Sequence, residues 1–207
     1  MASRLKEVFE DESLREKIAK KLPYLFHIAE LESSRAGKTG MEVGSLRERI
    51  LVALLIHKFG DRNVEADIPI TEPEIDARLF GHPICIKTIT GLGGIKFSWT
   101  VDALKAREFV ENYSPKSDLL LAQIAWGRVG GLFYVPLDIQ QRLFGTMGRE
   151  KYFVLPKPGT NPRGVEISKG TLLNFISDKG TKSIKIPWIR PKIDYYPYQR
   201  WIDYWKE

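Results

Sequence analysis

The chain has 207 residues, 43% of them hydrophobic, which is enough for one sizeable core but too short for two full domains to be expected. Lysine and arginine outnumber aspartate and glutamate by 32 to 26, so the formal net charge of +6 suits a polyanionic partner, either nucleic acid or an anionic membrane surface. No apolar run is long enough to span a bilayer, and residues 1–20 form a charged amphipathic pattern rather than a signal peptide. We therefore expect a soluble, cytoplasmic protein.

The cysteine and histidine content limits the kind of metal site. The single cysteine, Cys85, excludes an intrachain disulfide and a cysteine-rich zinc site. His27, His57 and His82 lack the spacing of metal ligands, so we expect them to pack in the core or lie at the surface. Any bound metal is expected to be held mainly by oxygen atoms.

The N-terminal region has helical periodicity. Residues 5–22 and 24–31 carry it on either side of Pro23, which predicts two short helices because proline favours the first turn of a helix. Glycines and basic residues break the pattern over residues 33–44, which predicts a loop.

The next segment predicts a buried helix. Ser45 and Glu48 have the spacing of a capping box, and the apolar run 50–56 ends near Gly60. Glu48 precedes Leu51 by three residues, which puts its carboxylate on or beside the inward face of this helix. The capping function and a function as a metal ligand are both open for Glu48.

The rest of the chain alternates between strand and helix patterns. Three β-like stretches, at residues 64–70, 74–80 and 84–90, predict a meander or mixed sheet, which residues 95–101 extend. Further on, the patterns predict a helix at residues 102–113 and two buried strands at 118–126 and 132–135, joined by a turn at Gly130-Gly131. We expect an α/β fold with a central mixed sheet flanked by helices.

Asp76 and Lys87 are predicted to stand opposite each other. A four-residue loop from Phe80 to Pro83, or a turn at Gly81-His82, aligns these two side chains on one face of the sheet. An ordinary cross-strand ion pair is the alternative explanation, since such pairs are common at protein surfaces.

These side chains are of the type that phosphodiester hydrolysis requires. The reaction needs a hard divalent cation held by oxygen atoms, an activated water and a positive group that steadies the developing charge. Glu48, Asp76 and the backbone carbonyl of Ile86 offer the oxygen ligands, and Lys87 offers the ammonium group.

Asp76 followed by Cys85-Ile86-Lys87 resembles the PD-(D/E)xK nuclease superfamily, which carries an acidic residue on one strand and an acidic-any-lysine motif on the next. Cys85 stands where the second acidic residue is expected, and Glu48 lies where some members of the superfamily carry a relocated carboxylate. The set Glu48, Asp76 and Lys87, in this order and spacing, resembles type II restriction endonucleases of the ThaI family, and the resemblance extends over the whole chain.

This resemblance implies a fold, a reaction and partners. It implies one restriction-endonuclease-like domain over residues 1–207, with N-terminal helices and a DNA-contacting loop at 1–44, a catalytic core at 45–135 and a C-terminal completion at 136–207. It also implies a homodimer that uses Mg²⁺ to cut a palindromic CGCG site in double-stranded DNA to blunt ends.

The loop at residues 35–44 is basic and rich in glycine, so Arg35, Lys38 and Gly40 can approach a phosphate backbone closely. Gly37-Lys38-Thr39 lacks the upstream glycine and the preceding strand of a nucleotide-binding loop, so no nucleotide cofactor is expected. We hypothesise that Met41 inserts into a base step, although packing back onto the domain is equally open.

Other side chains are candidates for contact with phosphates or base edges, while each is also compatible with an ordinary solvated surface position. They are Arg78, Lys96, Ser98, Trp99 and Arg128.

Alternative functions remain open at this point. A non-catalytic, architectural DNA-binding protein and a nuclease for repair or junction resolution fit the same charge and motifs, whereas the lack of a long basic amphipathic helix disfavours a membrane-surface protein. Residues 182–206 interleave aromatic and basic side chains, a pattern that serves nucleic-acid contact, partner contact or packing.

Overall fold

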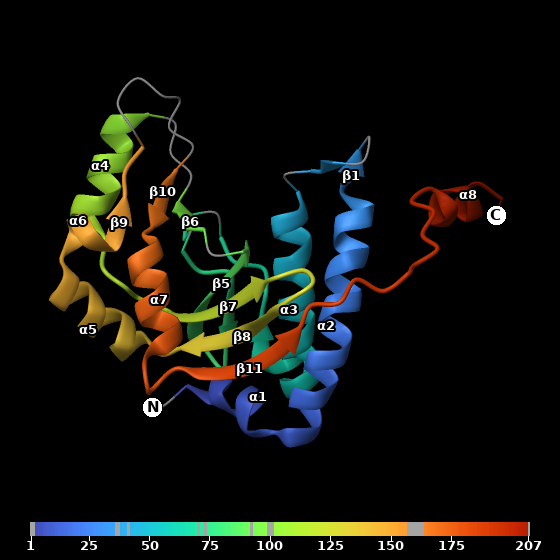
Figure 1. Ribbon diagram of the computed structural model, residues 1–207, viewed down its shortest axis with the longest axis horizontal. Helices are drawn as coiled ribbons and strands as arrows, with labels where there is room; N and C mark the ends of the chain where they lie inside the picture. The colour runs from blue at the N-terminus through green and yellow to red at the C-terminus, as the bar shows by residue number, and fades with distance from the viewer. Residues whose placement is uncertain are drawn as a thin grey trace.

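The computed structural model describes residues 3–35, 38–40, 42–69, 71–72, 74–91, 93–98, 102–156 and 164–206. Its centre is a six-stranded sheet in the order β11-β8-β7-β5-β4-β3 (Figure 1). The strands are β3 (Val64–Glu65), β4 (Ala77–Leu79), β5 (His82–Thr90), β7 (Asp118–Ile124), β8 (Val129–Val135) and β11 (Lys182–Pro187). Strands β5 and β7 run parallel and the other neighbours run antiparallel, which confirms the predicted mixed sheet.

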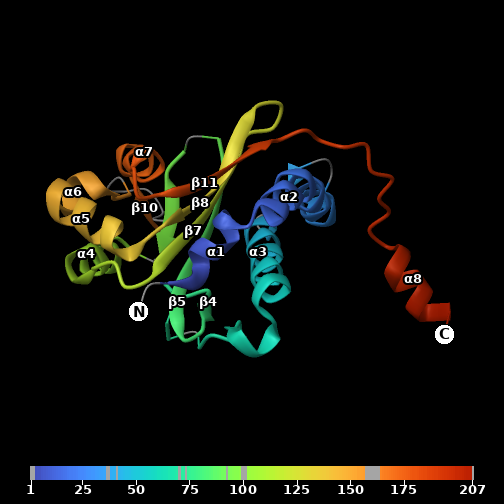
Figure 2. The ribbon, with the colours of Figure 1, turned by 90° about the horizontal axis from the view of Figure 1, so that it is seen from below.

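A layer of other elements covers each face of this sheet (Figure 2). One layer is N-terminal and consists of η1 (Arg4–Lys6), α1 (Glu7–Glu10), α2 (Glu12–Glu32) and α3 (Val43–Phe59). The other consists of α4 (Ala103–Asn112), α5 (Leu137–Met147), α6 (Arg149–Tyr152), α7 (Lys169–Ser177) and a small sheet of β6 (Ile95–Ser98), β10 (Val165–Ile167) and β9 (Phe153–Val154). The remaining elements are the hairpin β1 (Ser34–Arg35) and β2 (Lys38–Thr39), the turn η2 (Asp61–Asn63) and the C-terminal α8 (Gln199–Lys206). Within the described ranges, no helix combines the length and the apolar character needed to cross a bilayer.

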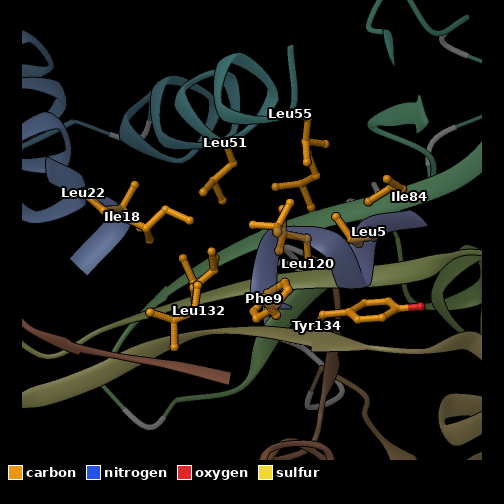
Figure 3. Close-up of a cluster of buried hydrophobic side chains, with 14 of the residues drawn as sticks. Leu5, Phe9, Ile18, Leu22, Leu51, Leu55, Ile84, Leu120, Leu132 and Tyr134 are labelled. Carbon is orange, nitrogen blue, oxygen red and sulfur yellow. The ribbon is translucent and has the colours of Figure 1, made fainter. Parts of the chain in front are cut away.

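Alternation of side chains along the strands builds one core on each face of the sheet. In β5, Ile84 belongs to the core beneath α3, whereas Cys85 belongs to the core on the opposite face. Figure 3 shows the first of these cores, in which Leu51 and Leu55 of α3 lie over Ile84 and Leu120. Every residue of β7 is buried, as expected for a central strand that is covered on both sides.

The N-terminal helices break at a different place from the one predicted. Helix α2 continues through Pro23, and the chain changes direction at Asp11, whose Oδ1 accepts a hydrogen bond from the N–H of Leu14 at 3.0 Å. Pro23 removes one helical donor, but it is buried, so tertiary packing outweighs this loss. The side-chain cap at Asp11, rather than Pro23, therefore sets the boundary between α1 and α2.

Helix α3 begins two residues earlier than the predicted capping box. Its first residue is Val43, and the preceding Glu42 makes no side-chain capping hydrogen bond, so the prediction that Ser45 caps this helix is wrong. The predicted end is confirmed, because Gly60 follows Phe59 with a φ of 84°, which favours glycine. Glu48 therefore lies inside the helix rather than facing its cap.

The β4–β5 hairpin turns one residue earlier than predicted. Phe80 and Gly81 have φ values of 49° and 79°, the left-handed geometry of a two-residue turn that matches strand twist, and Leu79 pairs with His82. Asp76 therefore does not stand directly opposite Lys87, and that register prediction is wrong.

Two further strand predictions need correction. Strand β6 does not extend the central sheet, since it pairs with β10 in the small sheet. The turn between β7 and β8 lies around Gly127, with a φ of 75°, rather than at Gly130-Gly131, which lie inside β8. A Cβ atom on Gly130 would clash with the carbonyl oxygen of Gln123 and lie 2.6 Å from Nε1 of Trp188, so this glycine permits close packing rather than a turn.

Candidate active site

Three separate elements bring Glu48, Asp76 and Lys87 together. Lys87 extends from β5, and its Nζ lies 2.9 Å from Oδ2 of Asp76 and 4.0 Å from Oε1 of Glu48. Asp76 directly precedes β4, and Glu48 belongs to α3. The three side chains converge despite the shifted register, because the Asp76 carboxylate and the long lysine chain bridge the offset between the strands.

Backbone hydrogen bonds fix the position of Asp76 against β5. Its N–H donates to the carbonyl of Ile84 at 2.9 Å, and its Oδ2 accepts a hydrogen bond from the N–H of Ile86 at 2.6 Å. The N–H and carbonyl of a strand residue point to the same side, so the carbonyl of Ile86 also faces the side of Asp76. The last paired residues of β4 and β5 are Ala77 and Ile84, so the carbonyl of Ile86 lies beyond the part of β5 that pairs with β4. Oxygen atoms from Asp76 and Ile86 are thus directed to the same side of β5.

The electrostatics of the three side chains are strongly coupled. Burial raises the pKa of Glu48 to about 7, an effect that Lys87 opposes and Asp76 reinforces. For Lys87, burial lowers the pKa, but Cys85 and the carboxylates of Asp76 and Glu48 outweigh burial and raise it. Lys87 is therefore a cation at neutral pH, and Glu48 is a carboxyl group whose charged form gains from a nearby cation.

Cys85, the departure from the nuclease motif, lies two residues before Lys87 on β5 and interacts electrostatically with Lys87, Asp76 and Glu48. It is 1% exposed and packs in the core on the face of the sheet opposite α3. Burial raises the pKa of its thiol to about 12, so it stays neutral. No group of three or more histidine, cysteine, aspartate or glutamate side chains with metal-binding geometry occurs among the described residues. A metal ion here would take the two carboxylates, the carbonyl of Ile86 and water as its ligands.

An open cavity of about 300 Å³ lies beside the carboxylates and gives access to them. Arg49 lines it together with Glu48 and Asp76, which adds a guanidinium group to the site. Sequence reasoning did not single out Arg49, and its position directly after Glu48 was the only available indication. The other lining residues are Ser45, Val52, Ala53, Ile56 and Ala66.

The predicted DNA-contacting loop is largely the β1–β2 hairpin, which leads directly into α3. Arg35 lies in β1 and Lys38 is exposed in β2. The N–H of Gly40 donates to the carbonyl of Ser33 at 2.9 Å, and this close approach leaves no room for a Cβ atom. Met41 lies outside the described residues.

The other candidates for DNA contact are not gathered with the three central side chains. Arg78 of β4 forms ion pairs with Glu72 at 2.5 Å and Glu65 at 3.4 Å, so acidic neighbours already compensate its charge. The remaining candidates lie on separate elements, Lys96 and Ser98 on β6 and Arg128 at the exposed β7–β8 turn, while Trp99 lies outside the described residues.

Comparisons with known proteins agree with this fold. The family model for restriction endonuclease ThaI matches residues 8–207. A solved structure described as "Restriction endonuclease in complex with substrate DNA" is 55% identical to this chain, with 99% of each chain covered and a TM-score of 0.93. No match was found among the curated proteins. The chain therefore belongs to the ThaI family of type II restriction endonucleases, which are site-specific DNA nucleases.

Proposed function

We propose that this nuclease uses Mg²⁺ to hydrolyse phosphodiester bonds of double-stranded DNA, with Glu48, Asp76 and Lys87 as its catalytic residues. The observation that carries this proposal is the convergence on Lys87 Nζ of the two carboxylates, at 2.9 Å for Asp76 and 4.0 Å for Glu48. The solved relative is described as bound to substrate DNA, which supports DNA as the partner.

The ligand chemistry around Lys87 suits magnesium. Mg²⁺ prefers hard oxygen ligands and retains several waters, so the carboxylates of Glu48 and Asp76 with the carbonyl of Ile86 are a sufficient set. When bound, the metal ion acts as a Lewis acid toward the phosphoryl group and helps to generate the nucleophile.

The side chains have separate tasks in this reaction. Asp76 holds the Lys87 ammonium by a direct hydrogen bond, which fixes the direction of its remaining donors. Lys87 orients the attacking water or stabilises negative charge on the phosphate, because it is a permanent cation with a side chain only 12% exposed. Burial raises the pKa of Glu48 to about 7, and a cation held in the site would favour the negatively charged form of this side chain.

The decisive experiment compares the wild type with Asp76→Asn on plasmid DNA, with magnesium and with chelator. The variant is expected to lose cleavage by at least about a hundredfold while its DNA affinity stays close to that of the wild type, since the change removes charge at the reacting centre rather than phosphate contacts. Asp67→Asn is the matched control, because Asp67 is an exposed aspartate between β3 and β4. Full cleavage by Asp76→Asn would reject this active site.

We also propose recognition of CGCG, blunt-end cleavage and a homodimer, which the family resemblance supports. A palindromic site calls for two active sites related by a two-fold axis. Linear duplexes that differ only in this tetranucleotide test the recognition. Cleavage at CGCG and at no variant of this tetranucleotide would identify a restriction enzyme. It would exclude a junction-resolving nuclease and a non-catalytic DNA-binding protein.

Insertion of Met41 into a base step remains part of this proposal, as does phosphate contact by Arg35, Lys38 and Gly40. Met41→Ala is expected to weaken binding to CGCG more than binding to unrelated DNA, because it removes an apolar wedge and no charge. Fluorescence anisotropy with both duplexes measures this difference. Equal affinities of the variant and the wild type for both duplexes would exclude insertion.

A further inference from the structure

The C-terminal end of the chain leaves the body of the protein as an arm, defined here as residues 189–206 (Figures 1 and 2). The arm ends in α8, and none of the eight residues of this helix is buried. Trp201, Ile202 and Trp205 form an apolar stripe along α8, and Trp205 is 91% exposed. A helix this short is not stable alone in water, so its apolar stripe requires a partner surface.

A surface of matching character lies on α2 and α3. It is an apolar groove of about 340 Å³, large enough for an aromatic side chain, with Lys17, Lys21 and His57 among the polar residues that line it. Its apolar lining consists of Leu14, Ile18, Leu22, Leu25, Ile50, Ala53 and Leu54.

The arm is tethered away from the groove of its own chain. Near its root, Nη2 of Arg190 donates to Oε2 of Glu30 at 2.9 Å, and within α8, Nη2 of Arg200 lies 3.0 Å from Oε1 of Glu32. Glu32 is the last residue of α2, whereas the groove residues of this helix run from Leu25 back to Leu14, roughly 10 to 27 Å away along its axis at about 1.5 Å per residue. These ion pairs hold α8 at the wrong end of α2 to fill its own groove.

We propose that the arm of one copy docks on the α2–α3 groove of a second copy, with Trp201, Ile202 and Trp205 in contact with the groove. This deepens the proposed function, because it rests on the homodimer. Trp201, Ile202 and Trp205 together expose roughly 350 Å² on each copy, taking about 200 Å² for each fully exposed large side chain. Counting an equal area of covered groove, two exchanged arms bury on the order of 1,400 Å² in total, which lies within the range of stable interfaces.

The charges on α8 favour a protein groove over DNA as the occupant. Asp203 accepts hydrogen bonds from Gln199 and Lys206, so the polar side chains of α8 bind to one another within the helix. Both cations of α8 are already paired, Arg200 with Glu32 and Lys206 with Asp203, whereas a DNA-binding helix needs cations directed at phosphates.

The test measures self-association of the full-length protein by sedimentation equilibrium. Trp201→Ala combined with Trp205→Ala is expected to raise the Kd of the dimer at least tenfold, and Leu25→Asp, on the groove side, is expected to do the same. Gln199→Ala on the polar face of α8 is the matched control and should leave the Kd unchanged. Circular dichroism checks that each variant is folded.

A photo-crosslinker identifies the occupant directly. With p-benzoylphenylalanine in place of Trp205, illumination should give a species of twice the chain mass, crosslinked to peptides of α2 or α3. A crosslinked product of monomer mass, an unchanged Kd in the variants, or a wild type that is monomeric both alone and on DNA would overturn the exchange. Variants that dimerise normally but lose DNA affinity would show that the arm binds DNA instead. Cleavage assays with Asp76→Asn test the nuclease site independently of any of these results.

Discussion

Glu30 carries a buried negative charge where α2, α3, the β7–β8 turn and the arm meet. Its side chain accepts hydrogen bonds from Arg47, from Nε1 of Trp126 at 2.7 Å and from Nη2 of Arg190 at 2.9 Å. Arg47 also donates to Oγ1 of Thr90 at 3.3 Å, so it links α3 to the end of β5. Arg47 directly precedes Glu48 in α3, so this network anchors the turn of the helix that carries Glu48.

Removing the charge of Glu30 should destabilise the fold strongly. Glu30→Ala leaves the buried Arg47 without its carboxylate, and breaking a buried pair in this way costs about 3–5 kcal/mol. Glu16→Ala, on the exposed side of the same helix, should change the free energy of unfolding by no more than about 0.5 kcal/mol. Urea unfolding of both variants gives the comparison. Equal stabilities would mean that the Glu30 network contributes little.

At the scale of strands and helices, Gly130 and Gly145 should respond to alanine in opposite directions. Gly130→Ala forces a Cβ atom against the carbonyl of Gln123 and the ring of Trp188, so the variant should lose about 1–3 kcal/mol. Gly145 is exposed in α5 with open space around its Cα, and Gly145→Ala should gain about 0.5–1 kcal/mol through its higher helix propensity. Thermal unfolding measures both shifts, and a Gly130→Ala protein as stable as the wild type would contradict the crowding argument.

Local sequence patterns predicted the existence of helices and strands more successfully than the pairing between strands. The apolar run of α3, its end at Gly60 and the helix beginning after Asp102 were all predictable, because periodicity and capping residues act within a few positions. The partner of β6 was not predictable, since β10 lies about seventy residues away in the chain and leaves no local trace. The β4–β5 register was missed for a different reason, namely that Phe80 adopts a positive φ, which is rare outside glycine.

The candidate site was partly predictable for similar reasons. Helical spacing put Glu48 near the inward face of α3, and Asp76 and Lys87 belong to one hairpin, where even a register error leaves their side chains within reach. Arg49 and the Glu30 network were missed because they depend on contacts between distant segments, which single-residue patterns do not encode.

For the whole molecule, the shared central sheet predicts a single unfolding transition. Both cores use the same strands, so neither layer can lose its packing without exposing β7, all of which is buried. Urea transitions followed by tryptophan fluorescence and by far-ultraviolet circular dichroism should therefore coincide. An early transition confined to the layer of α4 to α7 would contradict the prediction of one domain over residues 1–207.

The burial of Cys85 makes this chain well suited to site-specific labelling. The native thiol is inaccessible and stays protonated well above neutral pH, so maleimide and disulfide reagents should react with it slowly in the folded protein. A cysteine introduced on the arm or on the β1–β2 hairpin would then be the one fast-reacting thiol. Fluorophores or spin labels can be attached there without replacing Cys85, whose side chain helps to fill the second core.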